Sequence, residues 1–184
     1  MGIPVYFKTL VSKYQDTILH KGKLNDIQSI FFDLNCLIHP CCRGLTDETE
    51  MIHKILSEIQ RIINYVNPSE LVYIAIDGIP PKGKMKQQRM RRHKSVLEGK
   101  PWDTNAISPG TYYMNQLNHR LQSFTNDSVK QIIISDSTER GEGEHKILQY
   151  IKKNNIQQSV IYGLDADLIM LSMVSGKENI YLLR

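Results

Sequence analysis

The feature that most constrains the fold is a series of short apolar segments separated by stretches of helical periodicity. Segments of strand length, rich in β-branched and aromatic residues, occur at 29–34, 71–76, 131–135, 159–162 and 180–183. Helices are expected at 48–65, from about 80 through the basic segment, at 109–124, at 144–153 and at 167–173, with a loop at 95–108. Strands that alternate with helices form a mostly parallel sheet with helices on both faces, so the sequence predicts an α/β fold of three layers.

The expected helix at 48–65 shows the clearest periodicity. Its apolar residues recur three and four positions apart, which places them along one face of a helix. They are Ile52, Ile55, Leu56, Ile59, Ile62, Ile63 and Val66. A stripe of this kind predicts that the helix packs against the core.

Length and composition fit one globular domain. The chain has 184 residues, of which 41% are hydrophobic and 23% charged, as is usual for a soluble protein with a sizeable core. No repeat or linker interrupts the pattern, so we expect a single domain over residues 1–184. Because no apolar run approaches transmembrane length and the first residues do not form a signal peptide, we expect no membrane association. We expect a cytoplasmic location, with the nucleus as the alternative.

Three cysteines lie close together in the sequence, and they bear on the choice between a disulfide and a metal. They are Cys36, Cys41 and Cys42. An odd number of cysteines in so short a stretch argues against a disulfide framework. His39 lies among them, but a second ligand cluster at zinc spacing is absent, so zinc is the less favoured interpretation.

A dense run of cations follows the second expected strand. Residues 82–94 include seven lysines and arginines and no acid. Pro80 and Pro81 precede this run and suit the first turn of a helix. Four residues of the run would share one face of that helix: Lys84, Gln88, Arg91 and Arg92. Three cations and an amide on one face suit a phosphate, although on counting alone a solvated charged surface is as good an interpretation.

Six acids occur at or after the carboxyl ends of the expected strands. They are Asp33, Asp77, Glu142, Glu144, Asp165 and Asp167. The carboxyl ends of parallel strands lie at one edge of the sheet, where ligands bind in open α/β folds. Acids gathered there would repel one another unless cations were present, and Mg²⁺ or Mn²⁺ prefers carboxylate and water ligands.

Each acid has a simpler interpretation when it is taken alone. An aspartate before a helix, such as Asp165 or Asp167, is more often a helix cap or a partner of the helix dipole. Glu144, by contrast, shares a helical face with Leu148 and Ile151, so we expect its carboxylate to point inward. The joint pattern is what favours metal binding.

Several ordered segments carry a resemblance to a known family. They are residues 1–4 (MGIP), 32–35 (FDLN) with 38–40 (IHP), 77–78 with 84–92, 103–111, 141–147 and 163–171. With these segments the chain resembles the Xrn-type 5′→3′ exoribonucleases, within the flap-endonuclease-like group of metal nucleases. The resemblance spans nearly the whole chain and implies a PIN-like or flap-nuclease-like α/β fold.

The resemblance also implies a chemistry for the two sets of residues. The six acids would hold two Mg²⁺ or Mn²⁺ ions, which activate water and stabilise the leaving 3′ oxygen. Lys84, Gln88, Arg91 and Arg92 would bind the 5′-monophosphate of single-stranded RNA. His39 would stack on the first base, which is sequence-tolerant binding. A pocket for one phosphate would explain why hydrolysis starts at the 5′ end.

The sequence departs from the family pattern in two places. The segment between Arg92 and Asp103 is shorter than usual, and family members continue beyond the position of Arg184 with a further metal-binding aspartate and a second conserved region. We therefore expect a partner or a further segment to complete the site, and weak hydrolysis by the chain alone. Two alternatives stay open, a flap-type DNA endonuclease and a non-catalytic module that binds RNA 5′ ends. The segments 87–92 and 103–111 favour the ribonuclease.

Overall fold

A parallel sheet forms the centre of the molecule. The computed structural model describes residues 5–17, 24, 26–97, 99, 101–154 and 156–184. The strands in these ranges are β1 (Ser29–Asp33), β2 (Leu71–Ala75), β3 (Gln131–Ser135), β4 (Ser159–Tyr162) and β5 (Ile180–Leu183). They form one sheet in the order β3-β2-β1-β4-β5, and all four pairings are parallel. The predicted α/β class is confirmed, and each strand ends within one residue of its predicted position.

The strand order places β1 at the centre of the sheet. From β1 the chain builds outward through β2 and β3 on one side and through β4 and β5 on the other. The order therefore reverses between β1 and β4, and a reversal of this kind is where open α/β sheets bind ligands. Asp33 ends β1 at this point, opposite Ala75 of β2.

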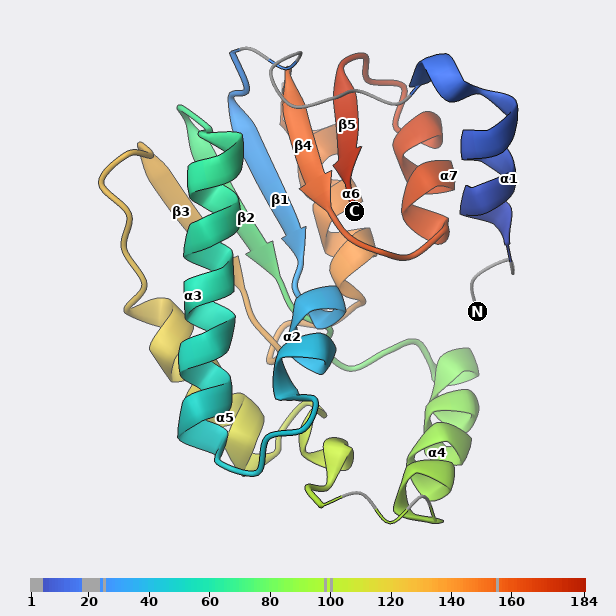
Figure 1. Cartoon of the computed structure of the whole chain (residues 1–184), viewed down its shortest axis with the longest axis vertical. Coiled ribbons are helices and arrows are strands. Elements are labelled where there is room, and N and C mark those ends of the chain that lie inside the picture. The colour runs from blue at the N-terminus through green and yellow to red at the C-terminus, as the bar shows by residue number, and fades with distance from the viewer. Residues whose placement is uncertain (1–4, 18–23, 25, 98, 100, 155) are drawn as a thin grey trace.

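Three helices cover one face of the sheet (Figure 1). They are α2 (Asn35–Cys42), α3 (Glu48–Val66) and α5 (Tyr112–Gln122). The predicted stripe of α3 is confirmed, because its isoleucines are buried against strand residues such as Phe32 and Ile74, while Leu56 and Val66 pack at the border of this core. Asp47 caps α3 by accepting a hydrogen bond from the Thr49 N–H at 2.8 Å.

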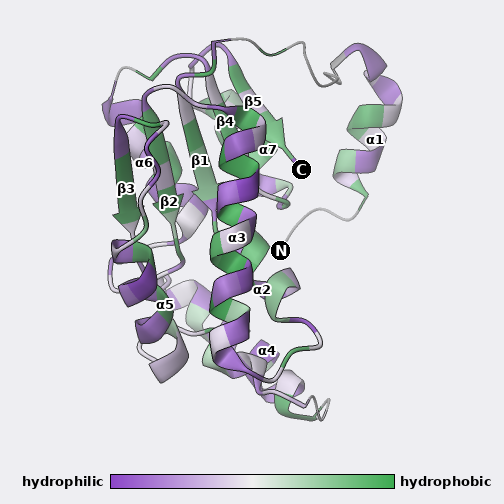
Figure 2. Ribbon diagram, turned by 60° about the vertical axis from the view of Figure 1, so that its left-hand side comes forward, coloured by the Kyte–Doolittle hydropathy of each residue, from purple (hydrophilic) through white to green (hydrophobic). Residues whose placement is uncertain are grey.

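Two helices cover the other face, α6 (Gly143–Lys153) and α7 (Asp167–Val174). Phe31, whose side chain lies on the opposite face from that of Phe32, packs there with Ile147 of α6 and Leu168 of α7. Figure 2 shows the strands as largely hydrophobic, as expected for a sheet that is covered on both faces. The three predicted layers are therefore present.

The sequence pattern missed two short helices, α1 (Tyr6–Lys13) and α2. Helix α2 has eight residues and contains Pro40 in its last turn, and a helix this short shows little periodicity. It forms because its apolar side chains reach the core, where Leu37, Ile38, Cys41 and Cys42 are buried. The MGIP segment at residues 1–4 lies outside the described residues.

The basic segment forms α4 (Lys82–Leu97), which begins directly after Pro81. None of its sixteen residues, all of them described, is buried, and the helix stands beyond the carboxyl edge of the sheet (Figure 1). The predicted loop at 95–108 is wrong at its start, because α4 continues through Leu97 and the short helix η2 (Thr104–Ala106) follows. A hydrogen bond of 2.7 Å between the Ser95 and Thr104 hydroxyls ties α4 to η2.

Within the described ranges, no helix combines enough length with enough apolar character to cross a bilayer.

Candidate metal and phosphate site

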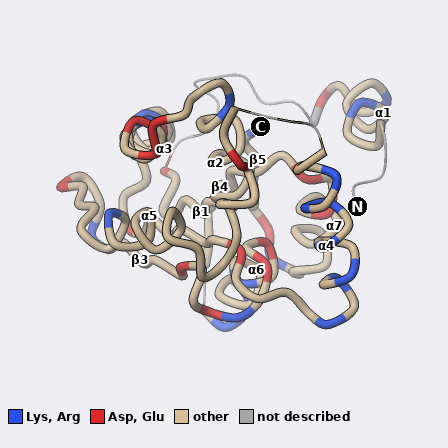
Figure 3. Tube along the Cα trace, turned by 90° about the horizontal axis from the view of Figure 1, so that it is seen from below, with Lys and Arg blue, Asp and Glu red and all other residues tan. Residues whose placement is uncertain are grey.

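The six predicted acids lie at the carboxyl edge of the sheet. The ends of β1 and β2 supply two of them, and the beginnings of α6 and α7 supply four. They are Asp33 and Asp77, Glu142 and Glu144, and Asp165 and Asp167. Figure 3, which views this edge, shows acids beside α6 and cations along α4. Neither α6 nor α7 has a side-chain capping bond at its N-cap, so capping does not account for the acids there.

Asp77 is held in place from two sides. Its carboxylate accepts a hydrogen bond of 2.7 Å from the N–H of Gly143, the first residue of α6, and its own N–H donates to Asn35 Oδ1 at 3.0 Å. A Cβ at position 143 would lie 2.9 Å from Asp33 Oδ1 and 3.5 Å from Asp77 Oδ1. A side chain would therefore crowd both carboxylates, which explains why glycine begins this helix.

Lys146, which no sequence pattern singles out, lies buried beneath the same region. Its ammonium donates to the carbonyl oxygens of Ile76 and Asp136, each at 2.8 Å. These bonds join the segment that carries Asp77 to the loop after β3. Burial lowers the pKa of Lys146, while nearby acids oppose that shift. No spacing rule distinguishes Lys146 from the exposed Lys152 on the same helix, so only the packed structure shows its role.

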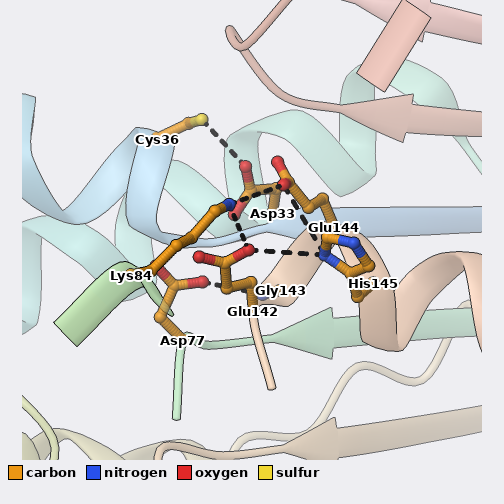
Figure 4. Close-up of polar contacts among 8 residues, drawn as sticks. All are labelled: Asp33, Cys36, Asp77, Lys84, Glu142, Gly143, Glu144 and His145. Carbon is orange, nitrogen blue, oxygen red and sulfur yellow. Dashed lines mark hydrogen bonds and ion pairs between the residues drawn. The ribbon is translucent and has the colours of Figure 1, made fainter. Parts of the chain in front are cut away.

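The close-up in Figure 4 shows Lys84 directed into the acidic cluster. Its Nζ lies 2.6 Å from Glu142 Oε2 and 4.0 Å from Glu144 Oε1. His145 Nδ1 lies 3.5 Å and 3.6 Å from the same two carboxylate oxygens. Both glutamates are buried, so the predicted inward direction of Glu144 is confirmed. The ligand atoms of Glu142, Glu144 and His145 all lie within 4.8 Å of one another.

A second group of donors surrounds Asp33. The Cys36 thiol donates to Asp33 Oδ2 at 3.1 Å, and its sulfur accepts the N–H of Leu164 at 3.3 Å. The donor atoms of Asp33, Cys36 and Asp165 also lie within 4.8 Å of one another. Cys36 thus bridges β1 to the segment after β4, a role that the spacing of the cysteines does not predict.

Burial makes three of the acids at this edge harder to ionise. Burial raises the pKa of Asp33 to about 7; Asp77 and Asp165 add to the rise and the Cys36 hydrogen bond opposes it. Burial also raises the pKa of Glu144 to about 7, an effect that Asp33 increases and Lys84 reduces. The pKa of Asp77 is raised for the same reason, against the hydrogen bond from Gly143. A bound cation would favour the ionised forms.

The predicted phosphate-binding face is only partly assembled. Gln88 accepts a hydrogen bond of 3.3 Å from the Arg92 guanidinium, whereas Lys84 turns toward the acids. Arg91 and Arg92 are exposed on α4, and His39 is exposed on α2. The roles of these side chains in binding RNA stay predictions.

The three cysteines are free thiols in different surroundings. Cys36 contacts Asp33, and Cys42 lies buried with its sulfur 3.1 Å from the Tyr113 hydroxyl. Among the described residues, neither group of close metal-ligand side chains combines two of the cysteines or includes His39. The structure therefore gives no support to the zinc interpretation.

Comparison with known proteins identifies the family. Residues 1–101 and 96–184 match the sequence model described as the N-terminus of XRN 5′-3′ exonucleases. Over 100% of this chain, similarity extends to 5′-3′ exoribonuclease 1 of Saccharomyces cerevisiae (32% identity), the 5′-3′ exoribonuclease 2 homolog of Drosophila melanogaster (30%) and 5′-3′ exoribonuclease 1 of Schizosaccharomyces pombe (32%). The chain spans 15%, 28% and 17% of the lengths of these relatives, respectively. The chain therefore belongs to the family defined by the N-terminal region of the XRN 5′-3′ exonucleases.

Proposed function

We propose that this chain forms the metal-dependent nuclease region of a 5′→3′ exoribonuclease that removes nucleotides from single-stranded RNA with a 5′-monophosphate. The observation that carries the proposal is the convergence of six acids, from four segments of the chain, beside a basic helix. Relatives over the whole chain are named 5′-3′ exoribonucleases, which supports RNA as the substrate.

The acidic cluster fits divalent cations by the chemistry of its donors. Carboxylate oxygens predominate, and burial raises the pKa of several of them, so a hard cation such as Mg²⁺ or Mn²⁺ would relieve a real electrostatic cost. Glu142 and Glu144 would hold an ion on one side, and Asp33 and Asp165 on the other, with Asp77 and Asp167 completing the set. When bound, two ions supply an activated water and stabilise charge on the leaving oxygen.

The basic helix would select the end of the substrate. Arg91, Arg92 and Gln88 would bind the 5′-monophosphate through charge-assisted and amide hydrogen bonds, together with Lys84. Since α4 stands at the edge where the acids gather, a phosphate held there would place the first phosphodiester near the acids. His39 on the neighbouring α2 would stack on the first base.

A direct experiment separates the three functions that the sequence left open. The purified chain is incubated with RNA of one sequence bearing either a 5′-monophosphate or a 5′-hydroxyl, in Mg²⁺, Mn²⁺ or EDTA. We expect mononucleotide release from the 5′ end of the phosphorylated RNA only when a metal is present. Binding of the phosphorylated end without hydrolysis in either metal would instead identify a 5′-end binding module. Preferred cleavage of a branched DNA substrate would identify a flap endonuclease.

A further inference from the structure

Lys84 contacts the acidic cluster and also lies on the predicted phosphate-binding face of α4. We propose that Lys84 couples metal binding to recognition of the 5′-phosphate. In the metal-free protein its ammonium is held by Glu142 and Glu144, and a divalent cation on these carboxylates releases it to bind phosphate. The inference rests on the proposed function, because it assigns both ligands to the same site.

The geometry supports competition for one position. Lys84 Nζ lies 2.6 Å from Glu142 Oε2 and 4.0 Å from Glu144 Oε1 (Figure 4). A cation coordinated through these two oxygens would lie about 2.0–2.6 Å from each of them. An ammonium 2.6 Å from the same Glu142 oxygen would then lie close to that ion, and the two positive charges would repel each other. Binding of one therefore weakens binding of the other.

The burial of the partners indicates which one moves. The side chains of Glu142 and Glu144 are only 11% and 10% exposed, whereas that of Lys84 is 40% exposed. The glutamates are anchored at the start of α6, which packs on the sheet, whereas Lys84 extends from α4, none of whose described residues is buried. The lysine is therefore the partner that leaves, and its exposure keeps the cost of leaving small.

Release of Lys84 links the two binding reactions. On α4, Lys84 lies one helical turn before Gln88 and two before Arg91 and Arg92, on the same face. A freed ammonium would thus add its charge to the phosphate-binding face, while a tethered one would not. By linkage, phosphate bound to Lys84 must then raise the affinity for metal by the same factor by which metal raises the affinity for phosphate.

The first test measures metal binding without RNA. Mn²⁺ is titrated into the wild-type chain and the Lys84→Met and Lys86→Met variants, and free Mn²⁺ is followed by electron paramagnetic resonance. Lys86 is exposed on the same helix, so its variant removes an equal charge as a matched control. We expect Lys84→Met to bind Mn²⁺ about fivefold more tightly and Lys86→Met to match the wild type within about twofold. Weaker binding by Lys84→Met, or an equal gain in both variants, overturns the proposal.

The second test measures the coupling itself. Two oligonucleotides with a non-hydrolysable first linkage, one 5′-phosphorylated and one 5′-hydroxyl, are bound with and without Mn²⁺. The wild-type preference for the phosphorylated end should rise with Mn²⁺, and the rise should be lost in Lys84→Met but kept in Lys86→Met. A wild-type preference that Mn²⁺ leaves unchanged overturns the inference.

The two proposals fail in different ways. If the wild-type chain shows the coupling but does not hydrolyse ordinary 5′-phosphorylated RNA, the nuclease function is wrong and the role of Lys84 stands. If it hydrolyses that RNA in Mg²⁺ but Lys84→Met leaves Mn²⁺ affinity unchanged, the nuclease function stands and the coupling is wrong.

Discussion

Asp165 and Asp167 lie on either side of Ala166, immediately before and at the start of α7. Replacing either by asparagine keeps the shape of the side chain and removes an anionic ligand. We expect Asp165→Asn and Asp167→Asn to abolish hydrolysis, because the loss of an anionic ligand weakens the binding of the metal ions. RNA binding should survive, because the fold is unchanged. The measurement is single-turnover hydrolysis at saturating Mg²⁺, with binding measured in parallel. Asp127→Asn, in an exposed loop, is the control, and near wild-type turnover by either site variant would contradict the assignment.

Lys146 gives a second prediction about a single residue. Lys146→Met removes the ammonium that bonds to the carbonyls of Ile76 and Asp136 and leaves both without that donor. We expect the free energy of unfolding to fall by about 2–4 kcal/mol. We also expect Mn²⁺ affinity to fall, because the bond from Lys146 to the Ile76 carbonyl holds the backbone next to Asp77 in place. Urea unfolding and Mn²⁺ titration measure the two effects. Lys152→Met, on the exposed side of α6, should change stability by no more than about 0.5 kcal/mol. Equal stability of the Lys146→Met and Lys152→Met variants would show that the hydrogen bonds of Lys146 do not stabilise the fold.

At the scale of elements, α4 is a helix that stabilises little and presents charge. Arg92→Ala should weaken binding of 5′-monophosphorylated RNA by about one to two decades, since a charge-assisted contact contributes about 1.5–3 kcal/mol. Binding of 5′-hydroxyl RNA and the melting temperature should change little, because Arg92 is exposed. Arg89→Ala, on the same helix but outside the predicted face, is the control. Equal losses on both RNAs would mean that α4 is a general electrostatic surface.

The elements also show what periodicity can and cannot predict. The stripe of α3 was predictable because seven apolar residues repeat over about four turns. The strand ends were predictable because each apolar run stops at a polar residue or a glycine. Helix α2 was not predictable, since Pro40 and the cysteines interrupt any pattern in its eight residues. The position of the acids followed from their place at the carboxyl ends of parallel strands, but the contact of Lys84 with Glu142 joins residues 58 positions apart. Side-chain contacts between residues so far apart depend on tertiary packing, which a local sequence pattern does not predict.

For the whole molecule, the raised pKa values predict an unusual pH dependence. Asp33 and Glu144 have ordinary values of 3.8 and 4.5, and both rise to about 7 in the folded protein. The folded state therefore keeps these protons to a higher pH than the unfolded chain, so the free energy of unfolding of the metal-free protein falls as pH rises from about 4 through about 7. We expect thermal melts in EDTA to show this fall.

Added Mg²⁺ should oppose the fall, because it binds the ionised carboxylates. The rise in melting temperature on adding Mg²⁺ should be larger at pH 8 than at pH 5, and Asp33→Asn should reduce both effects. A metal-free protein that becomes more stable between pH 5 and pH 8 would contradict the placement of these acids.

The central position of β1 determines the stage of folding at which the acidic site is assembled. Asp33 is made early in synthesis, but the strand that completes its surroundings, β4, is separated from it by most of the chain, and the bond from Leu164 to Cys36 closes a loop of 128 positions. Pairings of such long range form late, because their closure entropy must be overcome before any contact compensates it. A growing or partly folded chain thus holds its acids apart and cannot bind metal at this site. Any metal binding by these acids would therefore begin only once the long-range pairing of β1 with β4 is made.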